Sequence, residues 1–181
     1  MIRNKPCVLW FTGLSGAGKT TLVRELASML KDRHVPCRSL DGDDLRQSLN
    51  ADLGFSEEDR MENMRRVAEV AKLFLDEGYI ALVALISPLR RQRAAVRSLF
   101  EQGQFVEIFV DAPLSVCEER DPKGLYRRAR AREIENFTGV DDSYESPQNP
   151  DLHLQTHRES PSTLVKTIVT YLEGNELLLP N

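Results

Sequence analysis

A glycine-rich stretch over residues 13–20, GLSGAGKT, carries the clearest chemistry in the chain. It fits the pattern G-x-x-x-x-G-K-[ST], in which backbone N–H groups surround the phosphates of a nucleotide. Lys19 is expected to reach the β- and γ-phosphates, and the hydroxyl of Thr20 to hold magnesium. The predicted phosphate-binding residues are Gly13, Leu14, Ser15, Gly16, Ala17, Gly18, Lys19, Thr20 and Thr21. The stretch predicts binding of a nucleoside triphosphate, but it does not say what happens to the triphosphate.

The residues on either side give this stretch a strand–loop–helix setting. Residues 7–12 are apolar and predict a buried strand. Leu22, Leu26 and Leu30 recur four residues apart, which predicts one apolar face of a helix over residues 21–30. A glycine-rich turn that binds nothing is the alternative, but Lys-Thr at this spacing and in this setting favours phosphate binding.

Carboxylates follow the next predicted strand, residues 34–40. Ligands of open α/β sheets collect at the carboxyl ends of strands, so Asp41 and Asp43 are expected near the transferable phosphate. There they can bind magnesium through water or accept a proton from an acceptor hydroxyl. Asp and Gly are equally common in a turn with a helix cap, and this segment alone does not separate the two interpretations.

A long helix is predicted from Ser56, at a capping-box-like sequence, to Glu77 just before Gly78. Its apolar stripe consists of Met61, Met64, Ala68, Ala71 and Leu75. The lone aromatic Phe55 precedes Arg60 near the start of this helix. An aromatic ring with nearby arginines suits an adenine base with an anionic tail. A solvated helix face is the alternative.

The most apolar run, residues 79–86, predicts a central parallel strand that ends at Ser87-Pro88. Pro88 is expected in the first turn of the following helix. Ser87 lies at the carboxyl end of the strand, so it is either an active-site hydroxyl or a helix cap.

A polar, arginine-rich segment over residues 121–150 separates the last two predicted strands, residues 105–110 and 151–156. Long irregular segments inside a compact domain are often lids, and lid arginines can neutralise charge on a phosphoryl group during transfer. An RNA-binding arginine patch is the alternative, which the neighbouring acidic residues weaken. A final helix is predicted to begin at Ser160-Pro161 and to end at Gly174.

Composition and element order limit the class of protein. The 181 residues predict one domain, residues 1–181. Alternating strands and helices predict an α/β fold of the P-loop nucleoside-triphosphate hydrolase type. We expect a mostly parallel five-stranded sheet, helices on both faces and a lid segment. The net charge of −4 argues against a nucleic-acid partner.

The sequence has no signal-peptide core and no run of membrane-spanning length, so a cytoplasmic protein without a membrane partner is expected. Cys7, Cys37 and Cys117 have no pairing or metal-ligand spacing and are expected to be free thiols. A phosphate loop, a lid and a second site with an aromatic ring and arginines together predict a small-molecule or nucleotide kinase. These patterns do not identify the acceptor.

The ordered motifs closely resemble those of the adenylylsulfate kinase family over nearly the whole chain. They are GLSGAGKTT, DGDDLR, LGFSEEDRMENMRR, ISP, RDPKGLY and NFTGV, and together they are more specific than the phosphate loop alone. The resemblance implies that ATP, with magnesium, phosphorylates the 3′-hydroxyl of adenylyl sulfate. The products would be 3′-phosphoadenylyl sulfate and ADP, in sulfate assimilation. It also implies a homodimer and a functional link to an ATP sulfurylase, which is not expected within a chain of this length.

The resemblance implies roles for individual residues. Asp43 would be the base, Phe55 and Phe137 would sandwich the adenine, and Thr20 with Asp41 would hold the metal. The implied catalytic residues are Asp43, Lys19, Ser87 and Lys123. The implied substrate-binding residues are Asp43, Arg46, Phe55, Arg60, Asn63, Ile86, Ser87, Lys123, Leu125 and Phe137. The lid arginines Arg127 and Arg130 would join the phosphate loop in binding ATP.

Two positions qualify the resemblance. Ser87 matches the serine described in the family as a phosphoserine intermediate, but an in-line transfer needs no covalent step, so a hydrogen-bonding role is the alternative. Arg132 stands where the family usually has glycine, and it is expected to stiffen the lid. Two other functions stay open: a related kinase with a different nucleotide-linked acceptor, and a nucleotide-binding regulatory domain without turnover.

Overall fold

Five parallel strands form a single sheet in the order β2-β3-β1-β4-β5. The computed structural model describes residues 4–179. The strands are β1 (Val8–Thr12), β2 (Cys37–Asp41), β3 (Ile80–Ala84), β4 (Phe105–Asp111) and β5 (Leu152–Gln155). The predicted five-stranded parallel sheet is confirmed, and the predicted apolar strand β3 lies inside it, between β2 and β1.

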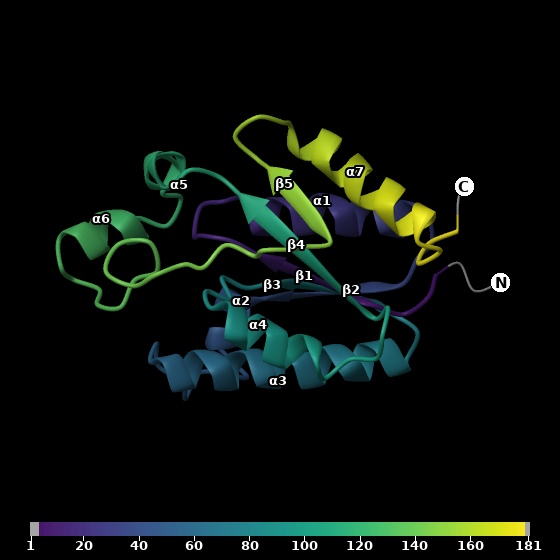
Figure 1. The fold of residues 1–181 in the computed structure, drawn as a ribbon, viewed down its shortest axis with the longest axis horizontal. Coiled ribbons are helices and arrows are strands. Elements are labelled where there is room, and N and C mark those ends of the chain that lie inside the picture. Colours follow the sequence, from purple (N-terminus) through teal and green to yellow (C-terminus); the bar gives the residue numbers. More distant parts are fainter. Residues whose placement is uncertain (1–3, 180–181) are drawn as a thin grey trace.

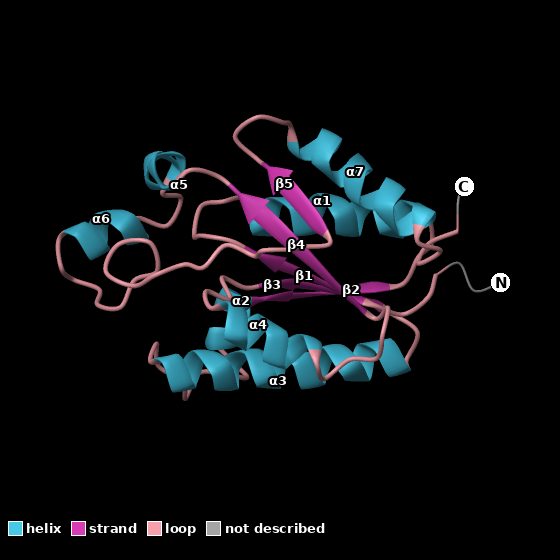
Figure 2. Ribbon diagram, in the orientation of Figure 1, coloured by secondary structure: helices cyan, strands magenta, loops and turns pink. Residues whose placement is uncertain are grey.

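Helices cover both faces of the sheet, which gives three layers (Figure 2). Helices α1 (Lys19–Asp32) and α7 (Pro161–Gly174) lie on one face. Helices α3 (Glu57–Asp76) and α4 (Arg90–Arg97) lie on the other. Alternate residues of β1 enter the two cores: Leu9 and Phe11 pack on the α1 side, whereas Val8 and Trp10 pack on the α3 side.

Three short helices lie toward the carboxyl ends of the strands, and two of them, α5 and α6, project beyond the layers (Figure 1). They are α2 (Gly42–Arg46), α5 (Leu114–Arg120) and α6 (Leu125–Arg130). Helix α6 and the irregular chain after it belong to the predicted lid segment, residues 121–150, and they project beyond the sheet. The fold therefore gathers its loops at the edge where the phosphate loop lies.

Local signals set the ends of the long helices as predicted. The Ser56 side chain accepts a hydrogen bond from the N–H of Asp59 at 3.1 Å, and the Ser160 side chain caps α7 in the same way. The prediction for Pro88 is wrong, because α4 begins at Arg90 with extended Leu89 as its N-cap. Ser87 adopts a left-handed φ of 49°, and the chain turns there before the helix can start.

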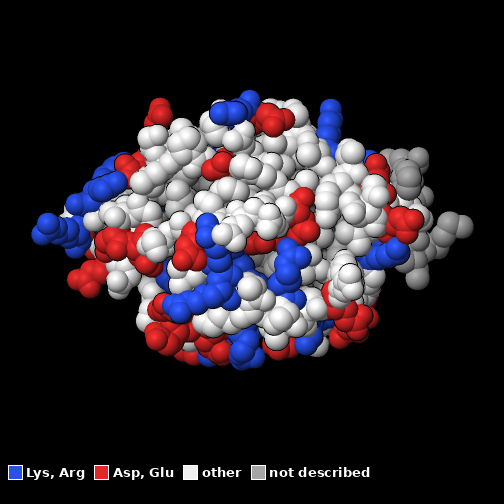
Figure 3. Space-filling view, viewed as in Figure 1, with Lys and Arg blue, Asp and Glu red and all other residues white. Residues whose placement is uncertain are grey.

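The remaining sequence expectations concern thiols, charge and membranes. All three cysteines are free; Cys7 and Cys117 are buried, and Cys37 is partly exposed. On the face drawn in Figure 3, lysines and arginines lie next to acidic side chains. Within residues 4–179 no helix has the length and apolar character needed to cross a membrane.

Candidate active site

The phosphate loop joins the buried strand β1 to α1, as the sequence predicted. Glycine is required at its tight points because the loop runs against other backbone. A Cβ on Gly13 would lie 2.2 Å from the carbonyl oxygen of Val110, and one on Gly16 would lie 2.9 Å from that of Cys117. Both glycines also have positive φ, 155° and 75°. The loop geometry thus depends on residues without side chains.

Lys19 folds back onto the loop it follows. Its Nζ donates to the carbonyl oxygens of Gly13 and Leu14, each at 2.8 Å. Burial lowers the pKa of Lys19 to about 8, because the charged ammonium has lost water. Since a desolvated cation gains more from an anionic partner than a hydrated one, Lys19 is well suited to a phosphate group.

Thr20 and Asp41 lie side by side next to the loop. The Thr20 hydroxyl donates to Asp41 Oδ2 at 2.7 Å, and Asp41 Oδ1 accepts from the N–H of Asp43 at 3.0 Å. Asp41 therefore caps α2, which confirms the helix-cap interpretation, and it also lies beside the phosphate loop, where its role toward magnesium or a proton stays a prediction. Mg²⁺ prefers oxygen ligands and usually takes one or two from the protein, with the rest from water and phosphate. The pair fits such an ion, although the described residues contain no group of three His, Cys, Asp or Glu placed to hold a metal.

A cavity of about 1100 Å³ opens above the loop. Pockets for a single small ligand are usually about 300–1,000 Å³, so this cavity is at or just above the upper end of that range. The predicted residues that line it are Ser15, Gly16, Gly18, Lys19, Thr20, Thr21, Asp41, Asp43, Arg46, Phe55, Arg60, Asn63, Ile86, Ser87, Lys123, Leu125 and Phe137. The fold thus brings together residues from the phosphate loop, α2, α3, the end of β3 and the lid segment.

The lid arginines are placed differently from expectation. Among the described residues that line the cavity, neither Arg127 nor Arg130 appears, and Arg130 forms an exposed ion pair with Glu118. Arg120 and Arg128 line the cavity in their place. Arg120 donates to the carbonyl oxygen of Gly16 at 3.2 Å. Sequence reasoning gave Arg120 no role, although it opens the RDPKGLY motif.

The far wall of the cavity combines arginines with an aromatic ring. The guanidinium carbon of Arg46 lies 4.2 Å from the centre of the Phe55 ring, within cation–π distance. Arg60 donates to the carbonyl of Phe55 at 3.0 Å and to that of Asn136 at 2.7 Å, so it ties α3 to the lid segment. This wall presents positive charge beside a flat apolar surface.

The two predicted adenine-stacking rings differ in their surroundings. Phe137 is 8% exposed and packs edge-on against Tyr126, with ring centres 5.0 Å apart. Phe55 is 54% exposed. One ring is therefore fixed by packing, whereas the other stands open on the cavity wall.

Two buried polar groups near these rings complete the wall. Thr138 lines the cavity, and its buried hydroxyl has no hydrogen-bond partner among residues 4–179. Burying an unpaired hydroxyl is costly, which marks it as a group that a ligand can satisfy. Sequence reasoning missed it, although it lies in the quoted NFTGV motif. The Asn50 side chain holds Asn63, because its Nδ2 donates to Asn63 Oδ1 at 2.9 Å. The side-chain N–H groups of Asn63 remain available for a ligand.

Asp43 and Lys123 meet across the cavity in an ion pair that joins α2 to the lid segment. Both side chains are about half exposed, so this pair is only weakly stabilising. A ligand that binds between them can separate them at little cost.

Ser87 is oriented away from the cavity even though its residue lines it. The side chain is 3% exposed, and its Oγ accepts a hydrogen bond from Trp10 Nε1 at 2.9 Å. The helix-cap interpretation of Ser87 is wrong, because Leu89 is the N-cap of α4. The observed arrangement matches the hydrogen-bonding alternative.

A parallel sheet of this order, with a phosphate loop after β1 and a cavity between the loop and a lid segment, defines a P-loop kinase fold. Comparison with known proteins narrows the class. The model of the adenylylsulphate kinase family matches residues 5–155. The adenylyl-sulfate kinase of Marinobacter nauticus is 51% identical over 178 residues, which are 98% of this chain and 89% of the relative. That of Aeromonas hydrophila is 55% identical over 175 residues, 97% and 89% of the two chains.

The structure is also similar to that of the Mycobacterium tuberculosis APS kinase CysC in complex with AMPPNP and APS. The TM-score is 0.90 at 45% identity, and the match covers 94% of this chain and 99% of the other. The chain belongs to the adenylylsulfate kinase family.

Proposed function

We propose that this protein transfers the γ-phosphoryl group of ATP to the 3′-hydroxyl of adenylyl sulfate, giving 3′-phosphoadenylyl sulfate and ADP in sulfate assimilation. The observation that carries the proposal is the large cavity with the phosphate loop at one end and the Arg46–Phe55–Arg60 wall at the other. Family membership supports the same reaction. Two anionic nucleotides bound head to head would fill this space.

The loop end of the cavity is assigned to ATP. Backbone N–H groups of the loop and the start of α1 would hold the phosphates, and Lys19 would move from the loop carbonyls to the β- and γ-phosphates. Thr20 and Asp41 would hold Mg²⁺, which would neutralise charge on the transferred group. Arg120 and Arg128 are better placed than Arg127 and Arg130 to contact the phosphates in this conformation of the lid. Arg127 and Arg130 would contact the phosphates only after the lid segment closes over them.

The opposite end is assigned to adenylyl sulfate. Its adenine would stack between Phe55 and Phe137, and Arg46 with Arg60 would pair with the phosphosulfate. Thr138 and Asn63 would supply hydrogen bonds to polar atoms of the nucleotide. Ile86 and Leu125 would add apolar contacts.

Asp43 is assigned as the general base that accepts the 3′-hydroxyl proton. It lies between the two ends and is paired with Lys123. When both substrates bind, Lys123 would leave Asp43 and neutralise charge on the phosphoryl group, so that one motion frees the base and adds a cation. Ser87 is assigned no covalent role, since its hydroxyl is used by Trp10.

The wider setting follows from the family resemblance. We place the enzyme in the cytoplasm as a single domain over residues 1–181 and as a homodimer, supplied by a separate ATP sulfurylase. Sedimentation velocity at micromolar concentration tests the oligomeric state.

The direct test is an assay of the purified protein with ATP, magnesium and adenylyl sulfate, with the product identified by mass. We expect 3′-phosphoadenylyl sulfate and ADP in equal amounts. A panel of other nucleotides separates the alternatives. Faster turnover with another acceptor would favour a related kinase, and binding of ATP without any ADP formation would favour a regulatory domain.

The variant Asp43→Asn tests the assignment of the base. It keeps the size of the side chain but removes its basicity, so we expect kcat to fall by about 10²-fold or more. The dissociation constant for adenylyl sulfate should stay within about threefold, as measured by calorimetry. Asp44→Asn, on the same short helix, is the control. Equal losses of turnover and binding would contradict a base role.

A further inference from the structure

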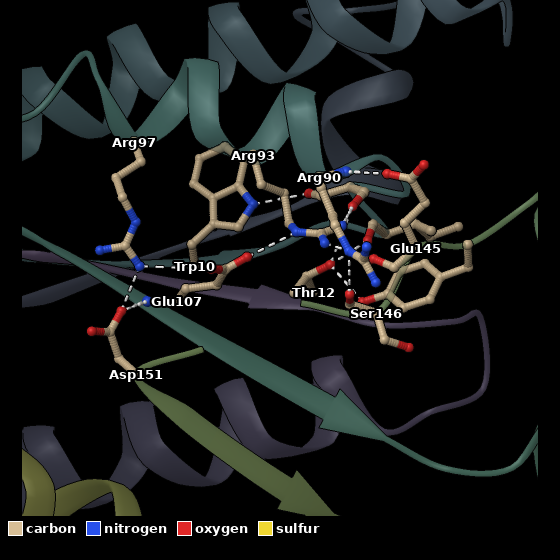
Figure 4. Close-up of polar contacts among 12 residues, drawn as sticks. Trp10, Thr12, Arg90, Arg93, Arg97, Glu107, Glu145, Ser146 and Asp151 are labelled. Carbon is tan, nitrogen blue, oxygen red and sulfur yellow. Dashed lines mark hydrogen bonds and ion pairs between the residues drawn. The ribbon is translucent and has the colours of Figure 1, made fainter. Parts of the chain in front are cut away.

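A buried arginine on α4, Arg93, connects three segments that are far apart in the sequence (Figure 4). Its Nε donates to Glu107 on β4 at 2.8 Å, and its two terminal nitrogens donate to the carbonyl oxygens of Ser87 and Glu145, each at 2.6 Å. The Arg93 side chain is 3% exposed. A charge buried this deeply needs a charged partner, and Glu107 supplies one. The two bonds to carbonyl groups satisfy the remaining guanidinium nitrogens and tie Arg93 to the backbone of two other segments.

One of these carbonyls belongs to a strained residue. Ser87 has a left-handed φ of 49°, which is unfavourable for a residue other than glycine. Two groups hold it in place: Arg93 donates to its carbonyl at 2.6 Å, and Trp10 donates to its Oγ at 2.9 Å. Strain that is held by several contacts marks a conformation that the fold is built to keep.

The strained peptide is part of the cavity wall. Residues 86–88 all line the cavity. The carbonyl oxygen of Ile86 accepts from the N–H of Gly13 at 3.3 Å and from the Thr12 hydroxyl at 2.6 Å, so this wall is joined to the first residue of the phosphate loop. Movement of Ser87 would therefore shift one side of the cavity relative to the loop.

The second carbonyl belongs to the chain that follows the cavity-lining part of the lid segment. The N–H of Glu145 donates to the carbonyl oxygen of Pro88 at 2.8 Å, and its Oε2 accepts from the N–H of Arg90 at 2.8 Å. Arg93 adds a buried hydrogen bond to these contacts, from its guanidinium group to the carbonyl oxygen of Glu145 (Figure 4). It is thus the one side chain in the figure that bonds to Ser87, Glu145 and Glu107 at once.

We propose that Arg93 is a positioning residue for phosphoryl transfer: it fixes the Ser87–Pro88 peptide, and with it the adenylyl sulfate side of the cavity, relative to the phosphate loop. The inference rests on the proposed function. Because the loop itself is built from β1 and α1, loss of Arg93 bonds affects the acceptor side more than the ATP side. Arg93 acts through the backbone it holds and does not need to touch either substrate.

Arg93→Lys is the sharpest test. Lysine keeps the positive charge opposite Glu107, but a single ammonium cannot replace the planar guanidinium that reaches three acceptors. We expect the KM for adenylyl sulfate to rise roughly tenfold, because small misplacements at an active site are costly, while the KM for ATP stays within about twofold. Arg97→Lys is the matched control: Arg97 lies on the same helix and also pairs with Glu107, at 3.6 Å, but its other partners are Asp151 and Phe105. It should leave both KM values unchanged.

A second readout does not depend on turnover. Trp10 is the only tryptophan in the chain, so its indole N–H gives a single cross-peak that reports the hydrogen bond to Ser87. In ¹H–¹⁵N spectra we expect this peak to move in Arg93→Lys and to move much less in Arg97→Lys, because Arg97 reaches Trp10 only through the Phe105 ring. Thr12→Val, which removes the hydroxyl bonded to the neighbouring Ile86 carbonyl and leaves the Arg93–Glu107 pair intact, should move it too. Thr12→Val therefore tests the inference even if Arg93→Lys folds poorly.

The outcomes separate the inference from the proposed function. An unmoved indole peak in both Arg93→Lys and Thr12→Val, or equal rises in the two KM values, would overturn the positioning role. If the peak moves in the variants but the parent protein does not phosphorylate adenylyl sulfate, the structural role of Arg93 at Ser87 is supported and the proposed function is overturned.

Discussion

The phosphate loop and the lid segment form two sides of one cavity, but different interactions hold them. The loop lies between β1 and α1, and its shape is set by backbone packed against backbone, with no room for a Cβ at Gly13. The lid segment combines buried contacts, such as that of Phe137 with Tyr126, with the exposed ion pairs Asp43–Lys123 and Glu118–Arg130. Exposed pairs of this kind contribute about 0–1 kcal/mol each.

This difference matches what phosphoryl transfer asks of the two regions. Phosphate oxygens must meet preorganised N–H groups, which a rigid loop supplies without reorganisation. A lid must admit two substrates and release two products, so its contacts have to break on the timescale of turnover. Tight backbone packing under the loop keeps its N–H groups in place. The exposed ion pairs of the lid segment can break and re-form during turnover.

The largest effect is expected at the loop. Lys19→Ala removes the one buried cation of the loop, and we expect kcat/KM to fall by roughly 10²–10³-fold, in line with the loss of one preorganised donor to a transition-state charge. Steady-state kinetics with adenylyl sulfate and ATP measure it. Lys31→Ala, at the exposed end of α1, is the control. Near-normal turnover of the Lys19 variant would mean that the loop does not hold the transferred phosphate.

Two glycines compare the regions directly through stability. Gly13→Ala forces a Cβ against the Val110 carbonyl and should lower the free energy of unfolding by about 3 kcal/mol. Gly124→Ala in the lid segment places an alanine at a left-handed φ of 64°, but its Cβ would meet no described atom within 4 Å. It should cost only about 1 kcal/mol. Urea unfolding measures both, and equal costs would contradict the contrast between rigid loop and open lid.

Ser87 lies where the sheet meets both regions, and its replacement separates a structural from a covalent role. Ser87→Ala leaves the buried Trp10 N–H without its partner, so we expect a loss of about 1–2 kcal/mol in the free energy of unfolding. Turnover should stay within about threefold of the parent. Trp10→Phe removes the same hydrogen bond from the other side as a control. Complete loss of turnover, with a phosphoserine detected by mass in the parent after incubation with ATP, would contradict this assignment.

The smallest effect is expected at Arg132, directly after α6. Arg132 has a left-handed φ of 59°, and its N–H donates to the carbonyl oxygen of Ala129 at 2.9 Å, as glycine commonly does at the end of a helix. Arg132→Gly relieves the strain but adds freedom to the unfolded chain, so we expect a net gain of about 0.5–1 kcal/mol. Asn136→Gly, at φ 56°, should gain less because asparagine tolerates this conformation. A loss of stability in Arg132→Gly would show that the arginine side chain makes a compensating contact.

Much of the fold could be predicted from local patterns. The phosphate loop, the ends of α3 and α7, and the alternation of strands and helices depend on residues close together in the sequence. Ser56 and Ser160 cap the helices that follow them directly, and Gly13 and Gly16 adopt backbone conformations that favour glycine. The same local logic failed at Pro88, because a hydrogen-bonded turn at Ser87, fixed by distant residues, delays the start of α4.

The sequence by itself determined the nucleotide-binding loop, the parallel sheet and the family, since each is written in the order and spacing of neighbouring residues. Only the tertiary structure decided that Arg120 and not Arg130 faces the phosphate loop, that Ser87 gives its hydroxyl to Trp10, and that Thr138 is left unpaired on the cavity wall. The physical reason is that a side chain's partner is chosen by packing and burial among segments far apart in the chain. Residue type and spacing carry no direct record of those meetings.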